Sequence, residues 1–174
     1  LTSMTFGENS QLTTIGGYAF YRCGGLTSVT FGENSQLTTI GYEAFEGCTR
    51  LTSIEIPDSV TYIGSYAFSN CISLTNVTFG ENSQLTTIGG GAFRNCTRLT
   101  SIVIPDSVTT ILAGAFDNCT SLTSVTFEDP NGWYRTDYYG WPDKTGGTKT
   151  TVTSASRNAT YLTDTYLWDY WYKK

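Results

Sequence analysis

The chain contains no histidine among its 174 residues. Histidine is the commonest general base at neutral pH and a frequent metal ligand. Its absence excludes Ser-His-Asp and Cys-His catalysis, and histidine-based metal sites, within this chain. The sequence also has no phosphate-binding glycine loop of the G-x-x-x-x-G-K or G-x-G-x-x-G type. We therefore expect a protein that is not an enzyme and needs no cofactor.

Charged residues are scarce as well. They make up 14% of the chain, against about a quarter in typical soluble domains, and the net charge is −5. Nucleic acids and anionic membrane surfaces bind faces rich in Lys and Arg, and this sequence has no basic cluster. No apolar run reaches the length of a transmembrane helix. We expect no nucleic-acid partner and no direct membrane insertion.

What the sequence does contain is an internal repeat of 25 or 23 residues. A period of this length with an L-x-x-L-x-L core is typical of leucine-rich repeats, in which each unit adds one coil to a solenoid. The period ends at residue 127, so we predict a solenoid over 1–127 and a C-terminal capping segment over 128–174. The repeats start at Leu1, Leu26, Leu51, Leu74, Leu99 and Leu122.

Each unit has a pattern that predicts its local structure. The first six residues alternate apolar and polar, which indicates a short parallel strand with one buried face. Equivalent positions should then form continuous ladders along the solenoid. The later Thr-Ile segment is compatible with a second short strand, and Ala-Phe-x-x-Cys has the spacing of about one turn of 3₁₀ or α-helix.

One cysteine per unit occupies a single column, three residues after a core phenylalanine. An odd count, identical positions and parallel side-chain directions argue against disulfides. A zinc site is favoured even less than disulfides, because the sequence has neither short C-x-x-C spacings nor histidine. We expect a stack of buried free thiols at Cys23, Cys48, Cys71, Cys96 and Cys119.

Two repeated phrases are more specific than the period. Ile-Pro-Asp-Ser-Val-Thr-x-Ile and Ala-Phe-x-x-Cys resemble the BspA-like, or Treponema-type, leucine-rich repeats of bacterial surface proteins. The resemblance covers residues 1–127. It implies a secreted or cell-surface protein of host-associated bacteria, usually with adhesion to host matrix proteins or other cells as its activity. The family is too diverse for the resemblance to imply a particular ligand.

The outward strand positions form one candidate site. They carry mostly hydroxyl groups, which suit either a solvated face or broad contact with a protein or glycan ligand. The candidates for this interaction surface are Ser28, Thr30, Ser53, Glu55, Asn76, Thr78, Ser101 and Val103.

An acid recurs at the eighth position of every unit and forms a second column. These residues are either solvated turn carboxylates or a row that Ca²⁺ or a basic surface would neutralise, although the dense D-x-D-x-D pattern of a calcium loop is missing. The next residue, Asn9, Asn34 or Asn82, should tie one turn to the next. The acidic column is Glu8, Glu33, Asp58, Glu81, Asp106 and Asp129.

Residues 128–174 hold all four tryptophans, Trp133, Trp141, Trp168 and Trp171. A solenoid needs a cap over its last coil, and so short a segment needs large side chains to form any core. We predict a small α+β unit with strands at 133–136, 149–153 and 168–172, a loop at 142–147 and a helix from Ser156, its N-cap, to Leu162. Stacking of sugars on the aromatic rings is the alternative.

These features favour a non-enzymatic interaction protein that is secreted or lies on the bacterial surface. A passive spacer or coat protein, and glycan binding through the aromatic segment, are the alternatives. Because the sequence opens on a full repeat, we also expect further repeats or a cap upstream, and self-association through the apolar edge of the first coil.

Overall fold

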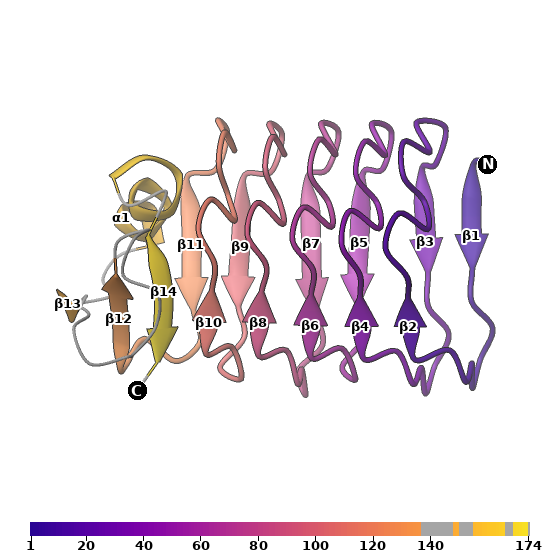
Figure 1. Ribbon diagram of the computed structural model, residues 1–174, viewed down its shortest axis with the longest axis horizontal. Coiled ribbons are helices and arrows are strands. Elements are labelled where there is room, and N and C mark those ends of the chain that lie inside the picture. Colours follow the sequence, from indigo (N-terminus) through magenta and orange to yellow (C-terminus); the bar gives the residue numbers. More distant parts are fainter. Residues whose placement is uncertain (137–147, 150–154, 166–168, 174) are drawn as a thin grey trace.

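The computed structural model describes residues 1–136, 148–149, 155–165 and 169–173. Residues 1–127 form a solenoid whose coils stack along the long axis of the molecule, each with two short strands that lie in two layers (Figure 1). The first set comprises β1 (Ser3–Thr5), β3 (Ser28–Thr30), β5 (Ser53–Ile56), β7 (Asn76–Phe79), β9 (Ser101–Ile104) and β11 (Ser124–Phe127). The second set comprises β2 (Thr14–Ile15), β4 (Thr39–Ile40), β6 (Tyr62–Ile63), β8 (Thr87–Ile88) and β10 (Thr110–Ile111).

Equivalent residues stack between the two layers and form the core. The phenylalanine rings of five successive coils lie nearly parallel, with centroids 5.0 to 5.5 Å apart, which corresponds to offset stacking. The leucine, isoleucine and alanine columns pack around them in one continuous cluster. The stacked rings are Phe20, Phe45, Phe68, Phe93 and Phe116.

The continuous ladder lies in the second set of strands and not in the first. The short strands β2, β4, β6, β8 and β10 pair in parallel from one end of the solenoid to the other. Within residues 1–127, the first set instead divides into the pairs β1–β3, β5–β7 and β9–β11, with no ladder from β3 to β5 or from β7 to β9. The expectation of one unbroken ladder through the first strands is therefore wrong.

A proline follows the first strand at each break in this ladder. Beside the last pair, the amide of Glu128 donates a hydrogen bond to the carbonyl of Ile104 in the preceding coil. Pro57 and Pro105 occupy the equivalent position after β5 and β9, and proline has no amide hydrogen to donate. Each break lies between a proline-containing coil and the coil before it, on the side where this donor is missing.

The Ala-Phe-x-x-Cys segment is not helical. In the first coil, alternate amides from Ala19 to Cys23 each donate to the carbonyl three residues earlier, so the segment is a series of β-turns. Tyr18 and Arg22 have φ values of 62° and 54°. Left-handed residues interrupt a helix, so the predicted turn of 3₁₀ or α-helix does not form.

The cysteines are free, and all except Cys23 are buried. Each buried thiol donates to the carbonyl of the core phenylalanine one coil earlier, at sulfur-to-oxygen distances of 3.0 to 3.3 Å. Burial raises the pKa of Cys48 and of Cys119 to about 12. The predicted thiol stack is confirmed for these four positions, whereas Cys23 in the first coil is partly exposed.

Asparagine side chains link the coils at two places. Asn34 donates to Asn9 at 3.1 Å, as the sequence predicts. A second ladder, which the sequence analysis missed, runs through the turns: Asn95 donates to Asn70 at 2.8 Å and accepts from Asn118 at 2.7 Å. These three residues have φ values of 57° to 59°, a left-handed conformation that asparagine tolerates better than most residues.

The C-terminal segment contains β12 (Trp133–Thr136), β13 (Thr148–Lys149), α1 (Ala155–Thr160) with a π-helical continuation η1 (Tyr161–Thr165), and β14 (Tyr170–Lys173). The strand at 133–136 is confirmed, and the last strand begins at Tyr170. The helix begins at Ala155, so Ser156 lies inside it and not at its N-cap. The predicted loop at 142–147, residues 150–153 of the predicted strand, and Trp168 lie outside the described residues.

This segment lies over the end of the solenoid. Strand β14 pairs antiparallel with β10, and α1 packs against β11, where Asn158 donates to the carbonyl of Val125 at 3.0 Å. Trp133 contacts Phe127 edge to face and is buried. A cap would have this arrangement, and the capping role of residues 128–174 stays a prediction. No helix in the described parts of the chain is long and apolar enough to cross a membrane.

The asparagine ladder predicts a difference between two substitutions at one site. Asn95→Ala loses both hydrogen bonds and leaves a Cβ in the left-handed region, so it should lower the free energy of unfolding by about 2–3 kcal/mol. Asn95→Gly loses the same bonds without the backbone strain and should cost about 1 kcal/mol. Gly47 already occupies the equivalent position of the second coil at φ 72°. Denaturant unfolding measures both values, and equal losses would contradict this account.

The thiol stack predicts a labelling pattern. Because the pKa values of the buried cysteines are raised, these groups stay protonated and unreactive in mildly alkaline buffer. A thiol reagent should therefore modify only Cys23 in the native protein and all five cysteines after denaturation. Peptide mass spectrometry identifies the modified residue. Rapid native labelling of Cys71 would show that the stack is open to solvent.

Deletion of residues 128–174 tests the predicted cap. It should expose Leu122, Val125 and Phe127, leave the edge of β10 unpaired and remove the helix that covers β11, so the truncated protein should aggregate. Size-exclusion chromatography with light scattering detects this. A truncated protein that stays monomeric and keeps the melting temperature of the full chain would show that the segment is not a cap.

Candidate interaction surface

The candidate strand residues lie together on the outward face of the first set of strands. In β5 and β9, exposed and buried residues alternate, so one side of each strand faces the core and the other faces solvent. Pairing aligns Ser53 with Asn76 and Glu55 with Thr78 across β5 and β7. All eight candidates are exposed: Ser28, Thr30, Ser53, Glu55, Asn76, Thr78, Ser101 and Val103.

This face is not flat, because a groove opens at each break in the ladder. The larger groove, of about 640 Å³, lies between β3 and β5 and extends into the turns that follow them. The smaller, of about 230 Å³, lies between β7 and β9 and reaches Glu128. The apolar period of the repeat does not reveal either groove. Pro57 and Pro105 were the signal that could have located them.

The larger groove is acidic and rich in hydrogen-bonding groups. Its lining includes Glu33, Glu55 and Asp58 together with serine, threonine, asparagine and glutamine, and it contains no Lys or Arg. The Oδ1 atom of Asp58 is buried and has no hydrogen-bond partner among the described residues. It faces Gly80 of the next coil, where a Cβ atom would collide with it. The groove therefore suits a polar ligand that carries positive charge.

The acidic column is not a uniform row. Asp129 accepts hydrogen bonds from the backbone and side chain of Asn131 and pairs with Lys173 at 3.0 Å, and these contacts, the backbone bond first, lower the pKa of its carboxyl group. Asp106 donates its amide hydrogen to Glu128. Among the described residues, no three acidic or cysteine side chains are placed to hold one metal ion. The geometry gives calcium binding no support.

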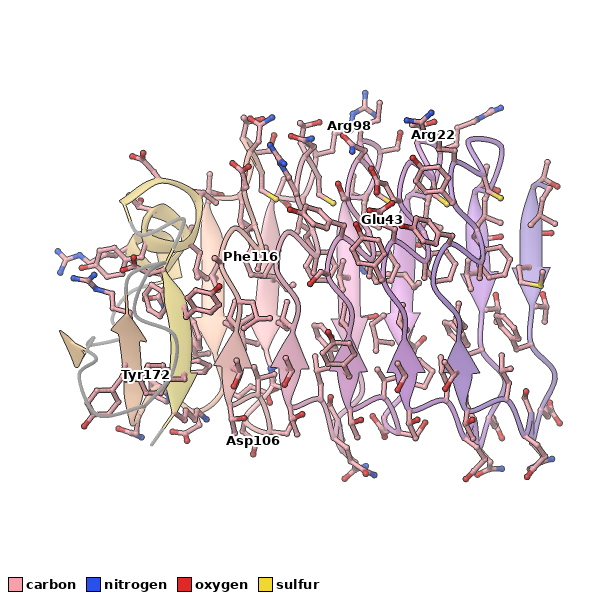
Figure 2. The ribbon with its side chains drawn as sticks, in the orientation of Figure 1. Arg22, Glu43, Arg98, Asp106, Phe116 and Tyr172 are labelled. Atoms are coloured by element: carbon pink, nitrogen blue, oxygen red, sulfur yellow. The ribbon has the colours of Figure 1, made fainter. Side chains whose placement is uncertain are left out.

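Two of the four tryptophans on which the glycan alternative rests lie among the described residues, and both are buried. Trp133 and Trp171 of the C-terminal segment are only 1% and 2% exposed, so they cannot form a sugar-stacking platform. Exposed tyrosines instead lie in the turns of the first coils, at Tyr18, Tyr21 and Tyr42. Glu43, beside Tyr42 in the chain, lies on the near side of the molecule in Figure 2, in front of the more distant first strands. The sequence analysis overlooked these tyrosines.

Comparison with solved structures finds the same architecture in bacterial proteins. Pneumococcal vaccine antigen PcpA is 33% identical over 76% of this chain, with a TM-score of 0.70. A leucine-rich repeat protein of T. pallidum is 35% identical over 70% of this chain, with a TM-score of 0.63. A leucine-rich cell surface protein of Faecalibacterium prausnitzii A2-165 is 32% identical over 76%, with a TM-score of 0.55. The chain spans only 32%, 57% and 40% of these three proteins.

A search of curated proteins found no match. The family described as the BspA type leucine-rich repeat region matches residues 13–134 in six copies. This range contains the stacked phenylalanines, the buried thiols and both grooves. The chain therefore belongs to the BspA-type leucine-rich repeat family.

Proposed function

We propose that this chain is a non-enzymatic interaction module of a secreted or surface-exposed bacterial protein, and that it contributes to adhesion to host matrix proteins or other cells. The observation that carries the proposal is the acidic groove of about 640 Å³ between β3 and β5. Its lining contains carboxylates and no basic residue, so it favours a basic segment of a partner protein.

The relatives support the surface location. One is described as a cell surface protein and another as a vaccine antigen. Self-association through the first coil is a second contact that we propose. Its support is that Leu1 and Leu12 are 63% and 39% exposed, whereas the equivalent leucines of later coils are buried.

Two alternatives predict different results. A passive spacer or coat protein binds no partner with a defined affinity. Glycan binding through the C-terminal segment would depend on tryptophans, of which Trp133 and Trp171 are buried. The groove is an open concave surface lined by polar groups. A passive spacer would not need such a surface, so the groove favours the interaction module over the spacer.

The proposal predicts that Glu55→Thr weakens binding to a basic partner about fivefold at low ionic strength, and less at high salt. Threonine already occupies the equivalent position in the first, second, fourth and sixth coils, so the substitution should not disturb folding. Surface plasmon resonance against a panel of purified extracellular-matrix proteins measures the effect.

Glu8→Thr is the matched control, because it removes the same charge from an exposed residue outside the groove. It should leave the affinity unchanged. If no matrix protein binds at micromolar concentration, the spacer alternative is favoured. If both variants weaken binding equally, net charge and not the groove determines the affinity.

A further inference from the structure

Four tyrosines form a row across the turns of the first three coils. The ring centroids of Tyr18 and Tyr42 are 5.3 Å apart, and those of Tyr42 and Tyr66 are 6.2 Å apart, with edge-to-face geometry in both pairs. Tyr21 contacts Tyr18 at 5.5 Å, also edge to face. We call Tyr18, Tyr21, Tyr42 and Tyr66 the tyrosine row.

The row lies on the surface and not in the core. Tyr18 is 54% exposed, Tyr42 is 44% exposed and Tyr21 is 37% exposed. Glu43, which lies between the third and fourth of these tyrosines in sequence, is on the near side of the solenoid in Figure 2. The row is thus distinct from the acidic groove, which is lined by the more distant first strands.

The backbone beneath the row favours glycine. Tyr18, Glu43 and Tyr66 have φ values of 62°, 52° and 57°, a region that side chains other than glycine enter at a cost. The fourth and fifth coils have Gly91 and Gly114 at the same position, at 62° and 67°. The first three coils therefore present large side chains where folding alone favours glycine. Strain of this kind is concentrated at functional sites.

Hydrogen-bonding groups lie beside the rings. Interaction with the neighbouring Glu43 carboxylate raises the pKa of the Tyr42 hydroxyl. Glu46 accepts from the Asn70 amide at 3.3 Å. The guanidinium of Arg22 lies 5.1 Å from the centroid of the Tyr21 ring. Carboxylate, amide and guanidinium groups thus occur in the same turns of the first three coils as the exposed rings.

We propose that the tyrosine row binds a neutral polysaccharide of pyranose sugars. The ring-to-ring spacing of 5.3 and 6.2 Å is close to the length of one pyranose unit in an extended chain, so successive coils can contact successive sugars, with ring faces and ring edges in alternation because neighbouring rings pack edge to face. The C–H faces of sugars pack on aromatic rings, and vicinal hydroxyls pair with carboxylate, amide and guanidinium groups. Glu43 and Glu46 outnumber Arg22, so the row disfavours sulfated and uronic-acid polymers.

The fold itself supplies the variants that test this proposal. Tyr18→Gly and Tyr66→Gly copy the residues of the fourth and fifth coils, and Tyr42→Ser copies Ser65 of the third coil. The triple variant should stay folded, because it relieves two left-handed positions. The full chain is titrated by isothermal calorimetry with a soluble β-glucan and a soluble galactan, with alginate and heparin as acidic probes. The triple variant should bind the neutral polymer about tenfold more weakly than the unmodified chain, or worse.

Tyr62→Thr is the matched control. Tyr62 is 38% exposed on β6, outside the row, and Thr39 and Thr87 occupy its position in neighbouring coils. This variant should bind like the unmodified chain, and thermal melts confirm that every variant is folded. The proposal is overturned if the unmodified chain binds no neutral polysaccharide, or if the folded triple variant keeps full affinity. It is also overturned if the acidic polymers, or a proline-rich peptide included as a protein-like probe, bind the row instead.

Discussion

Hydrogen bonds between the backbones of successive coils are the interaction on which the rest of this structure depends. At the turn after each second strand, the amides of Gly41, Gly64 and Gly89 donate to the carbonyls of Ile15, Ile40 and Ile63, at 2.8 Å in every case. Identical bonds fix an identical spacing, so any residue that recurs in the sequence must stack on its counterpart. The phenylalanine stack and the thiol-to-carbonyl bonds follow from that spacing.

The backbone hydrogen bonds between the second strands also explain why the first strands can separate to form the candidate site. The second strands keep their bonds in every coil, so the solenoid stays continuous even where the first strands separate. Pro57 and Pro105 each remove one donor on the other side without breaking the stack. The grooves are thus local openings in a scaffold that is held together elsewhere. A site of this kind can vary between coils with little effect on the fold.

The sequence predicted best what periodicity controls. The buried columns and the free thiols follow from the spacing of the repeat and are observed, and the predicted strand at 133–136 is observed as well. The unbroken first ladder was wrong: it breaks before each of the two coils that carry a proline after the first strand, and the apolar period is the same with or without that proline. The helical turn at Ala-Phe-x-x-Cys was wrong for a related reason: residues such as Tyr18 and Arg22 adopt positive φ, which side-chain spacing does not reveal. The acidic groove lies at one of the breaks in the first ladder, so the apolar period alone did not reveal it.

Residue types are constant from coil to coil in the buried columns and vary in the exposed ones. This difference distinguishes positions needed for folding from positions available for recognition. Phenylalanine and cysteine recur in all five complete coils, where each phenylalanine stacks on its counterpart and each buried thiol donates to the carbonyl of the phenylalanine one coil earlier. At the left-handed turn position, by contrast, the residue changes from Tyr18 to Glu43, Tyr66, Gly91 and Gly114. The backbone conformation is the same in all five, so stacking tolerates each side chain while glycine remains the least strained. At this position the backbone conformation is constant, the side chain varies, and side chains other than glycine cost stability. Residues that are kept despite such a cost are candidates for a role in binding.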